Sequence, residues 1–229
     1  MAKKVYGIFV AGGSGVRMGT EVPKQFLELG GRPILQQSIL KFVRACPEIV
    51  PVVALPADHI QTWKRLCHDN HFDLPQIIVE GGITRFHSVR NALAKVPDGV
   101  MVFIHDGVRP LISEELIKRI LAASRDELCV VPVTPVTDTL KSLVPAGDGT
   151  YRSSGEPDPD RAKLFGAQTP QLFPSETIKL AYEIGFDPSF TDDASVARAI
   201  NIPLTYIEGE RYNIKITTPE DLYLAEKLF

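Results

Sequence analysis

Residues 5–19 read Val5-Tyr-Gly-Ile-Phe-Val10-Ala11-Gly-Gly-Ser-Gly-Val-Arg-Met-Gly19, and Pro23-Lys24-Gln25 follow shortly after. The apolar run predicts a buried first strand that ends in a glycine-rich loop. Because the loop glycines lack Cβ atoms, the backbone can approach a ligand closely and present successive N–H groups as an anion site. Glycines alone would favour a mere tight turn, but Arg17 and Lys24 add two positive charges. We therefore predict a polyphosphate site.

Two familiar glycine loops do not fit this stretch. A P-loop ends in Gly-Lys-Ser/Thr, and no such triplet follows the first strand. The dinucleotide fingerprint Gly-x-Gly-x-x-Gly would place its last glycine at Met18. That fingerprint also needs an acidic residue about twenty positions further on, and none stands there. The loop therefore belongs to another type.

Apolar runs and amphipathic stretches then alternate along most of the chain. Short strands are predicted at residues 5–10, 49–55, 76–79, 100–104, 128–133, 203–207 and 213–216. Helices are predicted at residues 34–46, 58–69, 85–93, 113–125, 175–184, 192–200 and 218–228. Side chains suited to capping helix N-termini stand at Asp58, Thr84, Ser113, Thr191 and Thr218.

This alternation predicts an α/β fold with a Rossmann-like, mostly parallel sheet flanked by helices, because parallel strands need a crossover between them. Ligands in such sheets bind at the carboxyl ends of strands. Three distinctive loops lie at such ends, at residues 11–25, 80–88 and 105–110. The chain 1–229 is expected to form one domain, since its length and 44% hydrophobic content allow one sizeable core.

The pattern breaks between residues 134 and 165, where Pro, Gly, Asp and Ser are frequent and helical periodicity is lost. Residues 139–144 alternate as one strand of a hairpin would, and a β-like pattern returns at 163–165. A disordered surface insertion is the alternative, but so long an excursion is often functional. We predict a projecting β-arm at 134–165. Since a lone hairpin is marginal in water, we expect it to pack on a second subunit in a homodimer.

Composition narrows the partners and the compartment. The formal net charge is −3 and no basic run is present, so nucleic acid is not expected and polyanion binding needs a local cluster of cations. No apolar run reaches the roughly eighteen residues of a membrane span, and no signal peptide is recognisable. The cysteines Cys46, Cys67 and Cys129 are far apart in apolar surroundings. That distribution favours a reduced, cytoplasmic protein.

Asp106 follows the predicted strand at 100–104, where a carboxylate can bind a metal ion. Mg²⁺ usually takes one or two carboxylates together with substrate phosphates. The alternative is a turn aspartate that hydrogen-bonds its own backbone before Gly107. Arg109 stands in the same loop, where an ordinary surface arginine is the alternative.

Three more polar residues stand out by their spacing. Arg85 and Ser88 are three positions apart and share one face of a predicted helix. Lys215 lies between Ile214 and Ile216, which would face the opposite way in a strand. A lysine that projects alone from one face suits a phosphate.

The pattern of residues 11–35 resembles the opening of the nucleotide-sugar pyrophosphorylase-like nucleotidyltransferases. The variant Pro23-Lys24-Gln25-Phe26 narrows the resemblance to cytidylyltransferases that act on polyol phosphates. Further blocks match this family in order, at residues 81–88, 105–110, 136–139, 160–161, 168–171, 190–193 and 213–217. The departures are Gly107, where the family has alanine, and a longer arm tip rich in Pro and Asp.

The resemblance implies a role for each matching residue. Catalytic cations would be Arg17, Lys24 and Lys215. Nucleotide-binding residues would be Ala11, Gly12, Gly13, Gly15, Gly82, Arg85, Ser88, Asp106 and Gly107. Acceptor-binding residues would be Arg109, Thr139, Arg161 and Thr191, with Thr139 and Arg161 reaching across the dimer. Asp106 would also hold Mg²⁺ or another divalent cation.

The implied reaction is transfer of CMP from CTP to 2-C-methyl-D-erythritol 4-phosphate, with release of pyrophosphate, in non-mevalonate isoprenoid precursor synthesis. The acceptor phosphate needs no general base, because its second pKa is about 6. Ribitol 5-phosphate is the alternative acceptor, since sequence patterns do not separate two small polyol phosphates. A non-catalytic nucleotide-binding module is the alternative of another class, and the intact set of cations argues against it.

Overall fold

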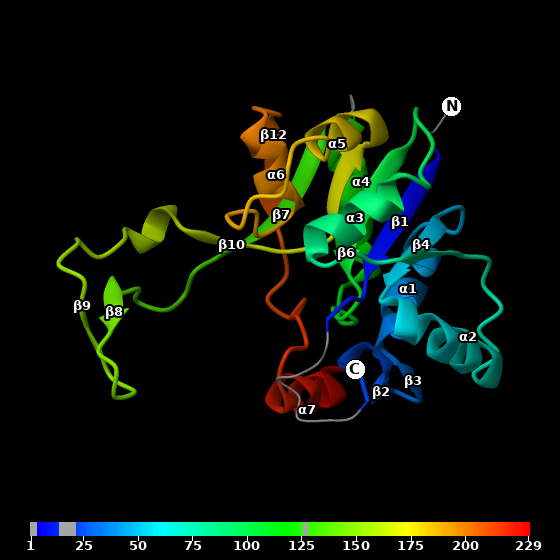
Figure 1. Ribbon diagram of the computed structural model, residues 1–229, viewed down its shortest axis with the longest axis horizontal. Helices are drawn as coiled ribbons and strands as arrows, with labels where there is room; N and C mark the ends of the chain where they lie inside the picture. Colours follow the sequence, from blue (N-terminus) through cyan, green and yellow to red (C-terminus); the bar gives the residue numbers. More distant parts are fainter. Residues whose placement is uncertain (1–3, 14–21, 126–127) are drawn as a thin grey trace.

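The computed structural model describes residues 4–13, 22–125 and 128–229. A central β-sheet carries helices on both faces, and one hairpin projects away from the rest (Figure 1). The predicted α/β class is therefore confirmed. Among the described residues, no helix is long and apolar enough to cross a bilayer.

The sheet is built around β1, the first predicted strand. Its strands are β1 (Val5–Val10), β4 (Val50–Leu55), β5 (Ile77–Glu80), β6 (Met101–Asp106), β7 (Cys129–Pro135), β10 (Phe165–Ala167), β11 (Gln171–Pro174) and β12 (Leu204–Glu208). They lie in the order β10-β7-β11-β6-β1-β4-β5, with β12 paired to β7. The pairs β1–β4, β1–β6, β4–β5 and β7–β12 are parallel. The carboxyl ends of β1, β4, β5 and β6 therefore meet at one edge.

One strand breaks the parallel pattern. β11 lies between β6 and β7 and runs antiparallel to both. It was not predicted, because its four residues lie directly before a helix and its register is visible only beside its neighbours. All four residues of β11 are buried.

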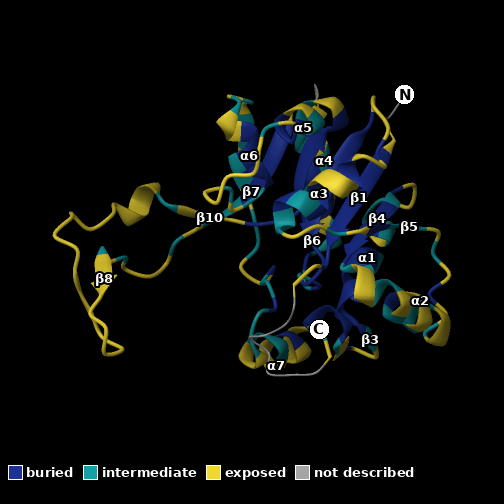
Figure 2. Ribbon diagram, in the orientation of Figure 1, coloured by how far each residue is buried: buried dark blue, intermediate teal, exposed yellow. Residues whose placement is uncertain are grey.

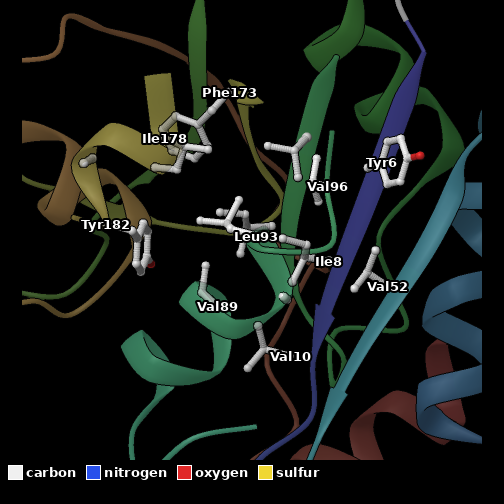
Figure 3. Close-up of a cluster of buried hydrophobic side chains, with 14 of the residues drawn as sticks. Tyr6, Ile8, Val10, Val52, Val89, Leu93, Val96, Phe173, Ile178 and Tyr182 are labelled. Atoms are coloured by element: carbon white, nitrogen blue, oxygen red, sulfur yellow. The ribbon is translucent and has the colours of Figure 1, made fainter. Parts of the chain in front are cut away.

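Helices from different parts of the chain cover the two faces of the sheet. α1 (Ile34–Ala45), α2 (Ile60–Asp69) and α4 (Glu114–Ala123) cover one face, whereas α3 (Arg85–Leu93), α5 (Ser175–Ala181) and α6 (Asp193–Ala199) cover the other. Figure 3 shows the second face, where Ile8 and Val10 of β1 lie toward Val89 and Leu93 of α3. Such burial on both faces explains why the strands read as continuous apolar runs.

A third, smaller cluster lies beside the sheet. α7 (Pro219–Leu228) contributes Ala225, which is buried with Leu29 of the short hairpin strands β2 (Glu28–Leu29) and β3 (Arg32–Pro33). Ile34, Val108 and Ile216 also belong to this cluster. It joins the segment after β6 to the segment before α7, so that residues 108 and 216 lie close together although they are distant in sequence.

Three of the predicted helix caps are confirmed. Thr84, Ser113 and Thr218 each accept a hydrogen bond from a backbone N–H in the first turn of α3, α4 and α7. The predicted cap at Asp58 is wrong, because a 3-10 turn, η3 (Ala57–His59), leads into α2 and the side chain of Asp58 caps nothing.

The predicted cap at Thr191 is also wrong. Asp192 caps α6 instead: its side chain accepts the N–H of Ser195, whose hydroxyl accepts the N–H of Asp192. A carboxylate next to the helix start outcompetes a hydroxyl one residue further away, since charge-assisted hydrogen bonds are stronger.

The predicted strand at residues 213–216 is absent. Hydrogen bonds from side chains hold this part of the chain, in place of the backbone hydrogen bonds of a strand. The amide of Gln168 bonds both the N–H and the C=O of Glu210, at 3.1 and 2.8 Å, and Asn213 Nδ2 donates to the C=O of Thr169 at 2.9 Å. Ile216 N–H donates to the C=O of Val108 at 2.9 Å. The segment is therefore held by loops that adjoin the sheet and does not join it as a strand.

The arm contains an antiparallel pair, β8 (Leu143–Pro145) and β9 (Tyr151–Ser153). The strand predicted at 139–144 thus begins later than expected, at Leu143. A 3-10 turn, η5 (Arg161–Lys163), precedes the return through β10. Figure 2 shows that most of the arm is exposed, in contrast to the buried sheet. Leu143 and Tyr151 are exposed by 50% and 68%.

Candidate active site

A cleft of about 240 Å³ lies at the carboxyl ends of β1, β5 and β6. Most of the predicted nucleotide and catalytic residues line it, namely Ala11, Gly12, Gly13, Lys24, Gly82, Arg85, Ser88, Asp106 and Lys215. A larger cleft of about 820 Å³ lies between β7, β10, β12 and α6, and of the predicted residues it contains only Thr191 among those described. The smaller cleft is therefore the candidate active site.

Asp106 is the centre of this cleft. Its Oδ1 accepts from Arg85 Nε at 3.2 Å, and its Oδ2 lies 3.4 Å from Arg109 Nε and 3.1 Å from Lys215 Nζ. Its backbone N–H donates to Thr169 Oγ1 at 3.0 Å. Three cations from three separate sequence blocks thus converge on one carboxylate.

The cations decide the ionisation of Asp106. Burial by itself would raise the pKa of Asp106, but Arg85, Lys215 and Arg109 outweigh it and hold that pKa well below its usual range. The carboxylate is therefore anionic at neutral pH. The neighbouring His105 is fully buried, and burial lowers its pKa to about 3. His105 is thus neutral and adds no positive charge to the cleft.

Arg85 is held by two carboxylates. While its Nε faces Asp106, its Nη1 and Nη2 donate to Oδ1 and Oδ2 of Asp193 at 2.9 and 2.7 Å. Tyr182 Oη also donates to Asp193 Oδ1, at 2.6 Å. Burial lowers the pKa of Arg85, but Asp193 and Asp106 outweigh that effect and raise it well above its usual value. Arg85 is therefore a fixed cation, and most of its donors are already used inside the protein.

Lys24 enters the cleft from η2 (Lys24–Phe26), and it is only 8% exposed. The next residue, Gln25, is fully buried and its Nε2 donates to the C=O of Ala11 at 2.9 Å. Gln25 thereby ties the Lys24 turn to the end of β1. The spacing between the glycine loop and Lys24 is set by this bond, which sequence reasoning did not find.

Ser88 and Gly82 also line the cleft. Ser88 Oγ accepts the N–H of Gly82 at 3.0 Å and donates to the C=O of Thr84 at 3.0 Å. Its hydroxyl proton is thus committed to the turn, which leaves acceptor capacity for a ligand. A Cβ at Gly82 would lie 2.3 Å from His87 Cβ, so only glycine fits there.

Gly107 follows Asp106 and faces the core more than the cleft. Its N–H donates to the C=O of Val10 at 2.9 Å, and its C=O accepts from Ser38 Oγ at 3.0 Å. A Cβ at Gly107 would lie 2.6 Å from Leu35 Cδ1. Leu35 therefore occupies the space that a larger side chain at position 107 would need.

The family model for IspD, 2-C-methyl-D-erythritol 4-phosphate cytidylyltransferase, matches residues 5–229. This chain belongs to the IspD family. It is 43% identical over 221 residues to the 2-C-methyl-D-erythritol 4-phosphate cytidylyltransferase of Bacteroides fragilis, covering 96% of this chain and 97% of the relative. It is 43% identical to the Porphyromonas gingivalis protein of the same name over 229 residues, covering 100% and 99%.

Solved structures agree with this assignment. The Thermus thermophilus enzyme of that name superimposes with a TM-score of 0.74 at 31% identity, covering 100% of this chain and 98% of that chain. The Francisella tularensis IspD superimposes with a TM-score of 0.79 at 27% identity, covering 99% and 100%. The family resemblance predicted from the sequence is confirmed.

The site residues of this IspD-family chain are distributed unevenly. Arg17 and Gly15 lie outside the described residues. Arg109 is brought to Asp106, but Thr139 and Arg161 lie exposed on the arm, where Arg161 Nη1 donates to the C=O of Thr137 at 2.7 Å. Thr191 is in the larger cleft. The roles predicted for these acceptor residues stay predictions.

Several residues that support the cleft had no predicted role. Thr169 Oγ1 bonds both Asp106 N–H and His105 Nδ1, at 3.0 and 3.2 Å. The C=O of Asn213 accepts from Arg109 Nη1 at 2.7 Å, and its side chain bonds Thr169. The signal was present, since both residues stand inside blocks that match the family, but only the fold shows what they touch.

The residues present fit a divalent cation that is held by one carboxylate together with substrate phosphates. Within the described ranges, no group of three or more His, Cys, Asp or Glu side chains could hold a metal ion. Asp106 supplies a single carboxylate, which is enough for Mg²⁺ when substrate phosphates complete its coordination. Of the three cations on Asp106, Lys215 has the most exposed side chain, at 39%.

Proposed function

We propose that this chain transfers CMP from CTP to 2-C-methyl-D-erythritol 4-phosphate and releases pyrophosphate, a step in the synthesis of isoprenoid precursors. The observation that carries the proposal is the convergence of Arg85, Arg109 and Lys215 on Asp106 beside Lys24, in a chain that belongs to the IspD family. A net charge of −3 would otherwise repel a triphosphate. The cleft supplies the local positive charge that such a ligand needs.

The chemistry requires charge and alignment more than proton transfer. An acceptor phosphate oxygen attacks the α-phosphorus of CTP, and the bond from that phosphorus to the bridging oxygen of the leaving pyrophosphate breaks. The acceptor is already anionic near neutral pH, since its second pKa is about 6. Lys24, Lys215 and Arg17 would stabilise the charge that develops, by preorganised electrostatics and positioning.

Asp106 would hold the metal ion that accompanies the triphosphate. Mg²⁺, when bound, would neutralise phosphate charge around the reacting phosphorus. The low pKa of Asp106 supports this role, because its carboxylate is ionised and needs no proton removed first. Arg85 would fix the orientation of the carboxylate.

The arm would complete the acceptor site of a neighbouring subunit in a homodimer. Thr139 and Arg161 would reach the partner's cleft, together with Arg109 and Thr191 of the chain that owns it. Exposed apolar side chains on the arm, such as Leu143 and Tyr151, support an interface there. Light scattering at working concentration tests this: a dimer is expected, and a monomer would contradict it. A cytoplasmic location is part of the proposal.

A paired-acceptor assay tests the function directly. Pyrophosphate release is measured with CTP and either 2-C-methyl-D-erythritol 4-phosphate or ribitol 5-phosphate, each with Mg²⁺ and with a chelator. We expect Mg²⁺-dependent release with the branched acceptor. Preference for ribitol 5-phosphate would replace the substrate, whereas CTP binding without pyrophosphate release from either acceptor would indicate a non-catalytic nucleotide-binding module.

A further inference from the structure

Two buried polar residues behind the cleft have no part in the proposed chemistry. Asp193, the first residue of α6, is 0% exposed, and Tyr182, which follows α5, is 2% exposed. Neither belongs to the lining of the cleft as the described residues form it. A buried carboxylate is costly unless it is paired and hydrogen-bonded, so its partners indicate what it does.

Asp193 is held in place from several sides. Gln171 of β11 accepts the N–H of Ala194 at 2.7 Å and donates to Asp192 Oδ2 at 2.7 Å, which fixes the start of α6 on the sheet. The ring of Tyr182 stacks on Phe86, the neighbour of Arg85, with centroids 4.7 Å apart and planes at 26°. The carboxylate therefore presents its two oxygens to Arg85 from a rigid support.

This support determines which donors Arg85 offers to the cleft. Both terminal nitrogens are bound by Asp193 in a two-pronged contact, and Nε is left for Asp106 Oδ1. The charge of Arg85 is balanced by Asp193, so Asp106 keeps Oδ2 for Lys215 and Arg109. Without Asp193, the two terminal nitrogens would lose their partner and turn to the nearest remaining anion, which is Asp106 or a bound triphosphate.

We propose that Asp193 and Tyr182 are positioning residues for nucleotidyl transfer, which act by holding Arg85 so that it orients Asp106 without competing for the nucleotide. The inference rests on the proposed function, since transfer is the activity they would tune. It gives a role to Gln171 and Asp192, from the blocks at residues 168–171 and 190–193, because their side chains hold the start of α6. A purely structural role, in which Asp193 stabilises the start of α6 independently of Arg85, is the competing account.

A double-mutant cycle distinguishes the two accounts. The variants are Asp193→Asn, Arg85→Gln and the double variant, each assayed for kcat/KM toward CTP at saturating acceptor. We expect Asp193→Asn to reduce kcat/KM about tenfold or more in the wild-type background, because a small misplacement can cost on the order of 10² in rate. In the Arg85→Gln background it should change kcat/KM by less than about twofold, since there is no guanidinium left to position.

The effect of Asp193→Asn in the two backgrounds decides between these accounts. Positioning through Arg85 is supported if the loss of kcat/KM caused by Asp193→Asn is more than about twofold smaller in the Arg85→Gln background than in the wild type. An equal or larger loss in that background contradicts it. If the wild-type protein releases no pyrophosphate from CTP with either acceptor, the proposed function fails and this inference fails with it. Additive losses in an active wild-type enzyme contradict the inference alone.

Two further variants guard against loss of folding. Tyr182→Phe removes only the hydroxyl that donates to Asp193 and keeps the ring on Phe86, so we expect a smaller loss in kcat/KM that also vanishes in the Arg85→Gln background. Ile178→Val is the matched control, because it weakens the buried face of α5 without removing a contact to Arg85. It should lower the melting temperature and leave kcat/KM near the wild-type value; an equal loss of activity in this control would contradict positioning.

Discussion

The cleft and the arm use the same residue types in opposite ways. In the cleft, the side chains of Asp106, Arg109 and Arg85 are only 9%, 13% and 25% exposed. On the arm, Lys141 pairs with Asp158, but their side chains are exposed by 57% and 46%. Coulomb attraction weakens in solvent, so exposed pairs contribute little. The buried charges therefore fix the side-chain geometry of the cleft, whereas the exposed ion pair on the arm contributes little to the conformation of the arm.

Apolar residues show the same contrast. Val10 at the edge of the cleft is 8% exposed and packs in the core, whereas Tyr151 and Leu143 at the arm tip are exposed by 68% and 50%. A chain gains stability from apolar groups only when water is removed from them. The apolar residues beside the cleft are thus buried within this chain, whereas those of the arm remain exposed and form the surface that the proposed homodimer would bury. Four matched pairs of variants test this difference.

The largest effect is expected at a lysine. Lys24→Ala should reduce kcat by about 10²–10³, because preorganised charge beside the reacting phosphate is lost. Lys163→Ala is the matched control, since that side chain is 83% exposed on the arm. Circular dichroism should show both variants folded. Near-normal turnover in Lys24→Ala would remove this residue from the mechanism.

A stability difference is expected between two aspartates. Asp106→Asn should lower the free energy of unfolding by about 3 kcal/mol or more, because Arg85 and Arg109 would be left buried without this partner. Asp158→Asn on the arm should cause no measurable loss. Urea denaturation of both variants, without added metal, measures the difference. Equal stability of the two variants would show that the cleft charges are as well solvated as those of the arm.

Two glycines sharpen the comparison at the level of packing. Gly107→Ala should lower the free energy of unfolding by about 1–3 kcal/mol, because its Cβ would lie 2.6 Å from Leu35 Cδ1 and force the core to move. Gly166→Ala in β10 should be tolerated, since the nearest atom to its Cβ, Thr134 Oγ1, would be 3.6 Å away. Thermal unfolding of the pair measures the contrast, and an equal shift in melting temperature would contradict it.

The smallest effect is a pH dependence at Tyr182. Burial, together with the negative charge of Asp193, raises the pKa of Tyr182 well above its usual value. The phenol is neutral in the folded and unfolded chains below about pH 9, so its stabilising effect is complete there. At higher pH the unfolded chain releases the proton first, and this contribution is lost as pH rises.

Wild-type protein should therefore lose more unfolding free energy between about pH 9 and pH 11 than Tyr182→Phe does. Tyr151→Phe is the control, because that hydroxyl is on an exposed arm residue and its removal should leave the wild-type curve unchanged. Urea denaturation at several alkaline pH values gives the slopes. Parallel slopes for wild type and Tyr182→Phe would contradict the coupling to Asp193.

Much of the molecule was predictable from local pattern. The continuous apolar runs identified β1, β4, β6 and β7, since strands covered on both faces need apolar residues at every position. Capping residues located the starts of α3, α4 and α7, because a backbone N–H and a side-chain oxygen a few positions apart are local partners. Apart from Lys215, the predicted residues that line the cleft stand in the three motif loops at strand ends.

The rest required the folded chain. Neither β11 nor the bond from Gln25 to Ala11 has a local signature, because each depends on a partner placed by the sheet. The strand predicted at 213–216 failed for the same reason: alternation is a local pattern, whereas Gln168 and Asn213 are paired across the fold.

Sequence alone therefore determined the class of fold, the family and the set of charged residues, because these depend on residue type and order. Tertiary structure decided which charges meet. Arg85 is 21 positions from Asp106 and 108 from Asp193, yet it contacts both. These two contacts hold its guanidinium in one orientation in the site. Electrostatic interaction depends on distance in space and on burial, and neither is written in the spacing of residues along a chain.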